Sequence, residues 1–239
     1  MVSSGKPQPV GPIRSEYTRD CYSNVSNPLS LFADSLIISV NVNQEGPSPR
    51  GESELVVSTA KETNLTALIK DPTGYFDKFN VTYKWQLNSA SISDINEKFI
   101  SHNFSTAQVN NVSVIVTATT EDRKTAKSGS KEIIFVSKDP ISNVSVDGKT
   151  FVHRDETLNL KLNLIGGSPP FHYCWEIKNT SSDHWDNYDA SRSCGKIEDP
   201  YFDVRRYFSE KGKYNLTVEV DNDVSNLSRL WSISIYDSK

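Results

Sequence analysis

The stretch that decides the fold is RYFSEKGKYNLTVEVDN, residues 206–222. Apolar residues occupy every second position from Tyr214 to Val220, and polar residues such as Asn215 and Thr217 lie between them. Side chains of a β-strand point alternately to opposite faces, so this pattern predicts a strand with one face in a core and the other in solvent. Gly212 predicts a tight turn into that strand, and Tyr214 is a candidate for the tyrosine corner of β-sandwich folds.

The same pattern occurs a second time, earlier in the chain. HNFSTAQVNNVSVIVTA (102–118) aligns with 206–222 without a gap, and this alignment matches Asn111 with Asn215 and Val114 with Val218. TYKWQLN (82–88) similarly parallels HYCWEIK (172–178), and each places a tryptophan in mid-strand, where we expect it in a core. Such self-similarity predicts two copies of one module.

Short alternating runs separated by turn residues fill most of the chain, and helical periodicity is nearly absent. The fold class predicted is all-β, with two tandem immunoglobulin-like β-sandwiches. We expect a flexible leader over residues 1–33, a first sandwich over 34–138 and a second over 139–239. SKDPISNVSV (137–146) is interpreted as the linker, and the basic cluster DRKTAKSGSK (122–131) as a solvated hairpin loop or a heparin-like contact.

The composition is that of a folded chain, with 36% hydrophobic and 23% charged residues among 239. A net charge of −4 gives no reason to expect nucleic acid or anionic lipid as a partner. No apolar run approaches the roughly 20 residues that a membrane-spanning helix needs. The first 17 residues contain no signal-peptide pattern, so the sequence taken literally describes a cytosolic protein.

Glycosylation sequons indicate a different compartment. About twice as many Asn-x-Ser/Thr sequons occur as chance predicts, and they are spread over the whole length. They are at Asn24, Asn64, Asn80, Asn103, Asn111, Asn143, Asn179, Asn215 and Asn226. We therefore expect the extracellular or lumenal part of a type I membrane protein, or a secreted protein, whose signal peptide and anchor lie outside this sequence.

The three cysteines fit an oxidising compartment. Cys174 and Cys194 are 20 residues apart in the second module, and we expect them to form a disulfide; the alternative is two buried free thiols. Cys21 is left over in the leader. It can pair with sequence outside this chain, link two chains into a dimer, or remain free.

The motifs GGSPPFHYCWEI (166–177) and YFSEKGKYNLTVEVDN (207–222) resemble those of a PKD (polycystic kidney disease) domain. The resemblance is good over about residues 139–237 and weaker over 34–138, where Gln108 and Asn110 replace the usual Gly and Tyr. A tandem pair with many sequons is similar to the ectodomains of the PMEL and GPNMB class of type I membrane glycoproteins. The resemblance implies Ig-like spacer or contact modules and no catalytic residues.

Residue patterns for catalysis or metal binding are not found. The four histidines have no zinc-ligand spacing, and no Gly-x-Ser-x-Gly elbow or phosphate-binding glycine loop occurs. We therefore expect no enzyme activity, no cofactor and no metal. The triplet Asp221-Asn222-Asp223 leaves two interpretations open, a calcium site and an ordinary strand-ending turn, of which the turn is favoured.

Residues 181–194 form a longer loop that the first module lacks. The candidate binding residues are His184, Trp185 and Tyr188 in this loop, with Arg205 and Arg206 nearby. The alternative is that Trp185 packs against its own sandwich. We expect a non-catalytic display or spacer module that binds a protein or carbohydrate partner at the cell surface. The rivals are accessory modules of a larger secreted enzyme and a cytosolic protein.

Overall fold

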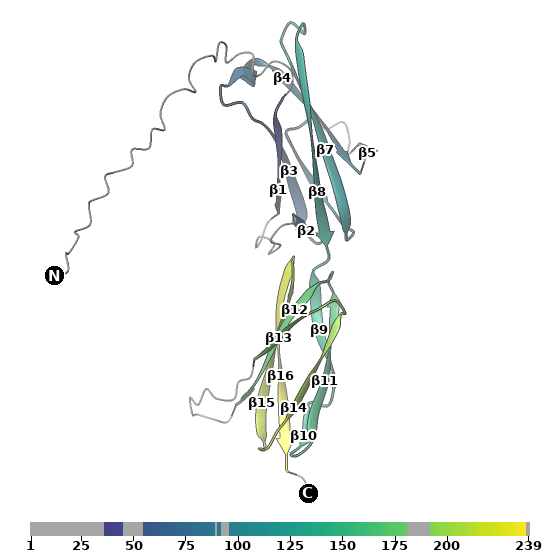
Figure 1. Cartoon of the computed structure of the whole chain (residues 1–239), viewed down its shortest axis with the longest axis vertical. Helices are drawn as coiled ribbons and strands as arrows, with labels where there is room; N and C mark the ends of the chain where they lie inside the picture. Colours follow the sequence, from purple (N-terminus) through teal and green to yellow (C-terminus); the bar gives the residue numbers. More distant parts are fainter. Residues whose placement is uncertain (1–35, 45–54, 89, 92–95, 181–191, 238–239) are drawn as a thin grey trace, which may run out of the picture. The chain divides into compact units, whose positions relative to one another are not determined.

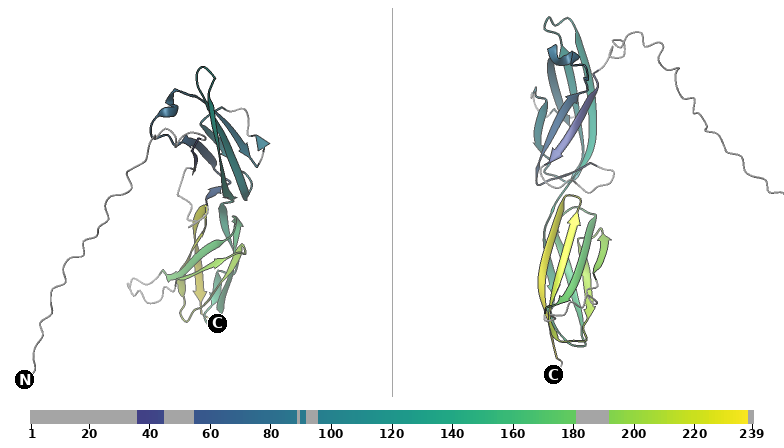
Figure 2. Two further views of the ribbon diagram at one scale, coloured as in Figure 1. Left: turned by 45° about the horizontal axis from the view of Figure 1, so that its top comes forward. Right: turned by 90° about the vertical axis from the view of Figure 1, so that its left-hand side faces the viewer.

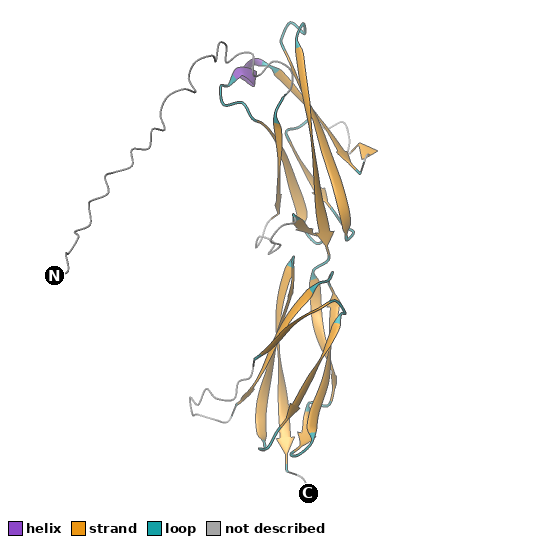
Figure 3. Cartoon of the chain, viewed as in Figure 1, coloured by secondary structure: helices purple, strands orange, loops and turns teal. Residues whose placement is uncertain are grey.

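A computed structural model of the chain describes residues 36–44, 55–88, 90–91, 96–180 and 192–237 (Figure 1). Strands dominate this part of the chain (Figure 3). One 3₁₀ helix, η2 (Tyr75–Lys78), accompanies them. The strands form four sheets, which pair as two sandwiches, and the views in Figure 2 show the layers of each. The all-β, Ig-like fold class predicted from the sequence is confirmed.

The first sandwich consists of a three-stranded sheet in the order β1-β3-β6 and a five-stranded sheet in the order β2-β8-β7-β4-β5. Its strands are β1 (Ile38–Gln44), β2 (Val56–Ser58), β3 (Glu62–Ile69), β4 (Asn80–Leu87), β5 (Ala90–Ser91), β6 (Phe99–Asn103), β7 (Gln108–Thr119) and β8 (Ala126–Lys138). All pairings are antiparallel except that of β2 with β8, which is parallel.

The second sandwich repeats this topology strand for strand. Its sheets have the orders β14-β11-β9 and β10-β16-β15-β12-β13, with a parallel pair between β10 and β16. Its strands are β9 (Ile141–Gly148), β10 (Phe151–His153), β11 (Thr157–Gly166), β12 (Phe171–Asn179), β13 (Ser193–Ile197), β14 (Tyr201–Tyr207), β15 (Gly212–Asn222) and β16 (Ser225–Tyr236). Below, we call β14-β11-β9 the short sheet and the other the long sheet of this sandwich.

Strand register supports the predicted duplication at single-residue level. Trp85 on β4 lies opposite Val114 on β7, and Trp175 on β12 lies opposite Val218 on β15. The gapless alignment matches the two valines, and the similarity of 82–88 to 172–178 matches the two tryptophans. Trp85 is buried, and Trp175 is half-buried against its core, so both tryptophans pack as expected.

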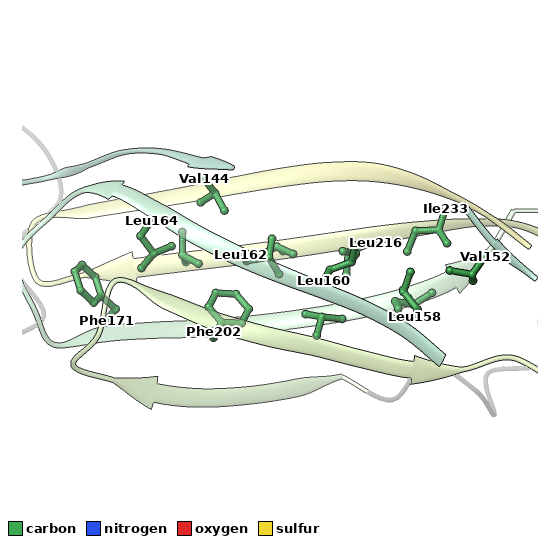
Figure 4. Close-up of a cluster of buried hydrophobic side chains, with 14 of the residues drawn as sticks. Val144, Val152, Leu158, Leu160, Leu162, Leu164, Phe171, Phe202, Leu216 and Ile233 are labelled. Atoms are coloured by element: carbon green, nitrogen blue, oxygen red, sulfur yellow. The ribbon is translucent and has the colours of Figure 1, made fainter. Parts of the chain in front are cut away.

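Each sandwich has its own hydrophobic core, because the inward faces of its two sheets carry the apolar set of the alternating pattern. In the second sandwich Leu158, Leu160 and Leu162 of β11 face Leu216 of β15 and Ile233 of β16 (Figure 4). In the first, Leu65 of β3 packs in a cluster with Trp85 and with alternate valines of β7. The two clusters share no residue.

Two sequence interpretations differ from the structure. The linker expected over 137–146 is only Asp139 and Pro140, because β8 continues to Lys138 and β9 begins at Ile141. The loop expected over 122–131 is shorter, because β8 begins at Ala126 and pairs with β7 up to Thr119. Both segments are polar, but a long neighbouring strand offers backbone hydrogen-bond partners, and the strands therefore continue into these segments.

Candidate binding surface beside the β12–β13 hairpin

His184, Trp185 and Tyr188 lie outside the described residues. The segment that contains them, residues 181–191, connects β12 to β13 at the edge of the long sheet. The structure does describe both ends of this segment, and these ends are held.

Both ends are anchored on the same neighbouring strand, β15. At the start, the backbone N–H and the Oγ1 hydroxyl of Thr180 donate to the carbonyl oxygen of Lys213, at 2.9 and 2.8 Å. At the end, Nη2 of Arg192 donates to Oε2 of Glu219 at 2.6 Å. Exposed ion pairs contribute little stability, so Arg192 positions the chain more than it stabilises the fold.

A disulfide joins the two strands of the hairpin at the level of the Arg192 anchor, since Cys174 lies opposite Glu219 of β15. The structure contains the predicted bond between Cys174 and Cys194, which lie directly opposite one another on β12 and β13 with Cα atoms 4.1 Å apart. Tyr173 and Trp175 pack against the core, so alternation places Cys174 on the outer face of the sheet. The bond therefore joins two neighbouring strands of one sheet and not the two sheets.

A shallow hollow lies beside the disulfide on this outer face. It is lined by Cys174, Trp175, Glu176, Arg192, Thr217 and Glu219. The hollow is thus bordered by the disulfide, by the ion pair and by the strand to which both anchors connect. This arrangement fixes Thr180 and Arg192, the residues on either side of the segment, and its described residues bring no nucleophile together with a base.

Arg205 and Arg206 lie on β14, in the short sheet, whereas the candidate segment connects strands of the long sheet. Arg205 is exposed, and its Nη2 lies 3.3 Å from Oδ2 of Asp203. Arg206 is half-buried and has an interaction partner of its own. Only Arg205 therefore presents an exposed side chain, and it does so from a different sheet.

Sequence reasoning missed the aromatic outer face of β14. Tyr201 and Tyr207 are exposed there, and Nζ of Lys161 lies 3.9 Å from the centre of the Tyr201 ring. The hydroxyl of Tyr207 donates to Oδ1 of Asp155 at 2.9 Å. This hydrogen bond to a carboxylate stabilises the neutral phenol and raises the pKa of Tyr207. The alternation in YFDVRRY (201–207) was the available signal.

The acidic triplet makes structural contacts at the β15–β16 turn. Asn222 is buried; its Nδ2 donates to the carbonyl oxygens of Asp139 and Ser168, at 2.9 and 3.0 Å. Its Oδ1 accepts from Ser225 Oγ at 2.7 Å. Asp223 pairs with Lys138, and Asp221 lies 3.8 Å from Nδ1 of His172. The three side chains thus have different partners, which supports the turn interpretation.

Eight of the nine sequon asparagines lie in described residues, and none of these eight is buried. Asn64, Asn80, Asn103, Asn143 and Asn226 are exposed, whereas Asn111, Asn179 and Asn215 are half-buried. Asn24 and Cys21 fall outside the described residues. The alternation that buries Leu216 and Val218 leaves Asn215 and Thr217 on the outer face, as predicted.

The part of the chain that the structure describes contains neither a metal-binding cluster nor a membrane-spanning helix. No group of three or more His, Cys, Asp or Glu side chains there could hold a metal ion. No helix there is long and apolar enough to span a bilayer.

No protein-family model matches the sequence, and no curated protein matches it. Among solved structures, the chain is similar to the fibronectin(III)-like modules of Clostridium thermocellum CbhA, with 15% identity over 83% of this chain and 94% of that chain, at a TM-score of 0.34. An ICAM-5 D1–D4 ectodomain fragment shows 9% identity over 85% of this chain and 62% of that chain, at a TM-score of 0.45.

The amphioxus IgVJ-C2 molecule shows 14% identity over 64% of this chain and 88% of that chain, at a TM-score of 0.36. Likeness at such identities extends to the fold alone. Fold and topology together define the class of the chain, a protein with two Ig-like β-sandwiches.

Proposed function

We propose that this chain is a non-catalytic extracellular glycoprotein region, in which two sandwiches of the PKD type display a binding segment to a protein or carbohydrate partner. The segment is residues 181–191, and the sandwiches act as spacers. An anchor outside this sequence holds the region on the extracellular or lumenal face of a membrane. The chain works without a cofactor.

The anchoring of both ends of the segment carries this proposal. Thr180 and Arg192 are bonded to one strand, β15, and the Cys174–Cys194 bond joins β12 to β13 near the Arg192 end. Ordering a segment on binding costs free energy, so fixing its ends beforehand lowers that cost. The sequence of the segment supplies Trp185, Tyr188 and His184, residue types that contribute strongly at interfaces.

The disulfide and the sequons support the extracellular location. Disulfides persist in oxidising compartments and are rare in the cytosol. None of the eight described sequon asparagines is buried, which is compatible with glycosylation at these positions. Peptide mass spectrometry of native material tests this part: free Cys174 together with unmodified sequons throughout contradicts it.

Replacing residues 183–190 by a Gly/Ser stretch of equal length tests the binding part, since it keeps Thr180, Arg192 and the disulfide. The readout is binding of the multimerised chain to a panel of cultured human cells, by flow cytometry, and to a printed glycan array. We expect the binding signal of the variant to be at least tenfold lower than that of the wild type, on the cells or glycans that the wild type recognises. The melting temperature should be unchanged. The matched control is Lys161→Ser with Arg205→Ser on β14. Equal binding by the segment variant, or equal loss in the control, contradicts the proposal.

A further inference from the structure

Two exposed aliphatic side chains flank the sequon asparagine of β7. Val109 and Ile134 are each 64% exposed, the highest values among the large apolar residues that the structure describes. Ile134 on β8 lies directly opposite Asn111, and Val109 precedes Asn111 by two positions, so all three side chains share the outer face of the sheet. The side chain of Asn111 thus starts between two uncovered apolar groups.

The second sandwich provides an internal comparison, because Asn215 occupies the equivalent position on β15. Its cross-strand neighbour on β16 is Ser232, and the residue two positions before it is Lys213. Both sequon asparagines are half-buried on an outer sheet face. Asn111 and Asn215 therefore occupy equivalent positions on equivalent strands. The named neighbours of Asn111 are apolar, whereas those of Asn215 are polar.

We propose that Val109 and Ile134 form a seat for the first N-acetylglucosamine of a glycan on Asn111, so that this glycan stabilises the first sandwich. One face of a pyranose ring presents C–H groups, which pack on aliphatic side chains and remove them from water. Two side chains are far too small a patch for a protein partner, whose interface covers about 800 Å² on each side. A single sugar ring, by contrast, needs only one or two such side chains to pack against.

The amide of Asn111 is compatible with this modification. Its Nδ2 donates to Oε1 of Glu132 on β8, and a glycosylated amide keeps one N–H for that bond. In the attachment, a bond forms between Nδ2 and C1 of the sugar, and the bond between C1 and the pyrophosphate of a lipid-linked oligosaccharide donor breaks. The lipid pyrophosphate leaves, and Nδ2 loses one proton. This step rests on the proposed extracellular route of the chain.

The test uses the full chain secreted from human cells that make high-mannose glycans, after an endoglycosidase has trimmed every glycan to one N-acetylglucosamine. Amide hydrogen exchange of β7 and β8 is compared for the wild type, Asn111→Gln, Val109→Thr with Ile134→Thr, and the triple variant. Exchange of β15 and β16 in Asn215→Gln is the matched control. Peptide mass spectrometry measures the occupancy of each sequon beforehand.

We expect Asn111→Gln to raise exchange rates in β7 and β8 about fivefold when Val109 and Ile134 are present, and to change them little when both are threonine. Asn215→Gln leaves β15 and β16 nearly unchanged. An equal effect of Asn111→Gln in both backgrounds overturns the proposal. So does an unoccupied Asn111 beside occupied sequons elsewhere, a result that leaves the extracellular function standing. Absence of glycans at all nine sequons overturns both.

Discussion

At the scale of single residues, the two sandwiches differ in the side chain at the start of their equivalent strands, β7 and β15. In the second, the hydroxyl of Tyr214 donates to the carbonyl oxygen of Glu210 at 3.2 Å, which is the tyrosine corner expected from the sequence. In the first, the equivalent residue is Asn110, which is fully buried and donates from Nδ2 to Ser137 Oγ at 2.8 Å. A buried amide thus replaces a phenol at the same corner.

Replacing Asn110 by leucine tests this polar corner. The change removes the donor to Ser137 and leaves the side-chain amide of Gln108 without the Oδ1 that accepts from it at 3.2 Å. The bond from Asn110 Nδ2 to the Gln108 carbonyl oxygen is lost as well, whereas Ser137 keeps its bond to Thr106. A hydrogen bond contributes about 0.5–1.5 kcal/mol, so the loss of several predicts faster amide exchange in β7 and a lower free energy of unfolding. Tyr214→Phe removes one hydrogen bond and should cost only about 1 kcal/mol. An unchanged or raised stability of Asn110→Leu contradicts this account.

Asp71 gives a prediction on pH dependence. Its carboxylate accepts from the backbone N–H of Phe76 at 2.6 Å and from the N–H and hydroxyl of Thr73 at 3.2 and 2.9 Å. These bonds, that of Phe76 most strongly, lower the pKa of Asp71. Because the folded pKa is depressed, the contribution to stability is present above the unfolded pKa, about 3.9, and is lost as pH falls through the folded pKa.

A carbon-detected NMR titration of the Asp71 carboxyl should therefore give a midpoint below about 3.9. The variant Asp71→Asn should show a weaker loss of stability in acid than the wild type, because it has no proton to gain. A midpoint at or above the ordinary value, or equal acid sensitivity of the two proteins, contradicts the prediction. Asp77→Asn in the neighbouring 3₁₀ helix serves as the control.

For single residues, the sequence predicted burial correctly where the two-residue alternation of a strand determines which face a side chain lies on. The inward and outward sides of β15, and the burial of Trp85, follow from alternation alone. The role of Asn222 could not be predicted, because its amide bonds to Asp139 and Ser168, which are 83 and 54 residues away. The anchors of the candidate segment, Thr180 and Arg192, likewise depend on partners on another strand.

At the scale of elements, long central strands were predictable and short edge strands were not. The strands β7 and β15 have 12 and 11 residues, which is enough for a clear period. The strands β5 and β10 have two and three residues and carry no period of their own. They form because a long neighbour offers backbone donors and acceptors. The parallel pairing of β10 with β16 is such a case.

The hairpin β12–β13 carries the prediction for an element. Cys174 and Cys194 enclose a sequence separation of 20 residues, and a cross-link of that length stabilises by about 3 kcal/mol, mainly by restricting the unfolded chain. Cys174→Ala with Cys194→Ala should therefore lower the urea midpoint of the second sandwich. The exposed ion pair gives the contrast, since Arg192→Gln should cost less than about 1 kcal/mol. Comparable losses in the two variants would show that the disulfide adds nothing beyond local contacts.

At the scale of the whole molecule, the two sandwiches have separate hydrophobic cores and separate strand pairings. The first core runs from Leu36 to Phe135 and the second from Ile141 to Ile235. No strand pairing among the described residues crosses from one set to the other. A domain of roughly 100 residues with its own core is large enough to fold independently. The predicted boundary after residue 138 therefore also predicts that the two sandwiches unfold independently of one another.

A matched pair of core variants tests it. Val114 and Val218 occupy equivalent positions on β7 and β15, and their exposed fractions are 0% and 1%. Truncation of either to alanine removes two buried methyl groups and should cost about 2 kcal/mol. If the two cores unfold independently, Val114→Ala accelerates amide exchange only in β1–β8, and Val218→Ala only in β9–β16. Faster exchange in both sets of strands from a single substitution means that residues 36–237 unfold as one cooperative unit, and the predicted boundary then marks a repeat of topology without a boundary of stability.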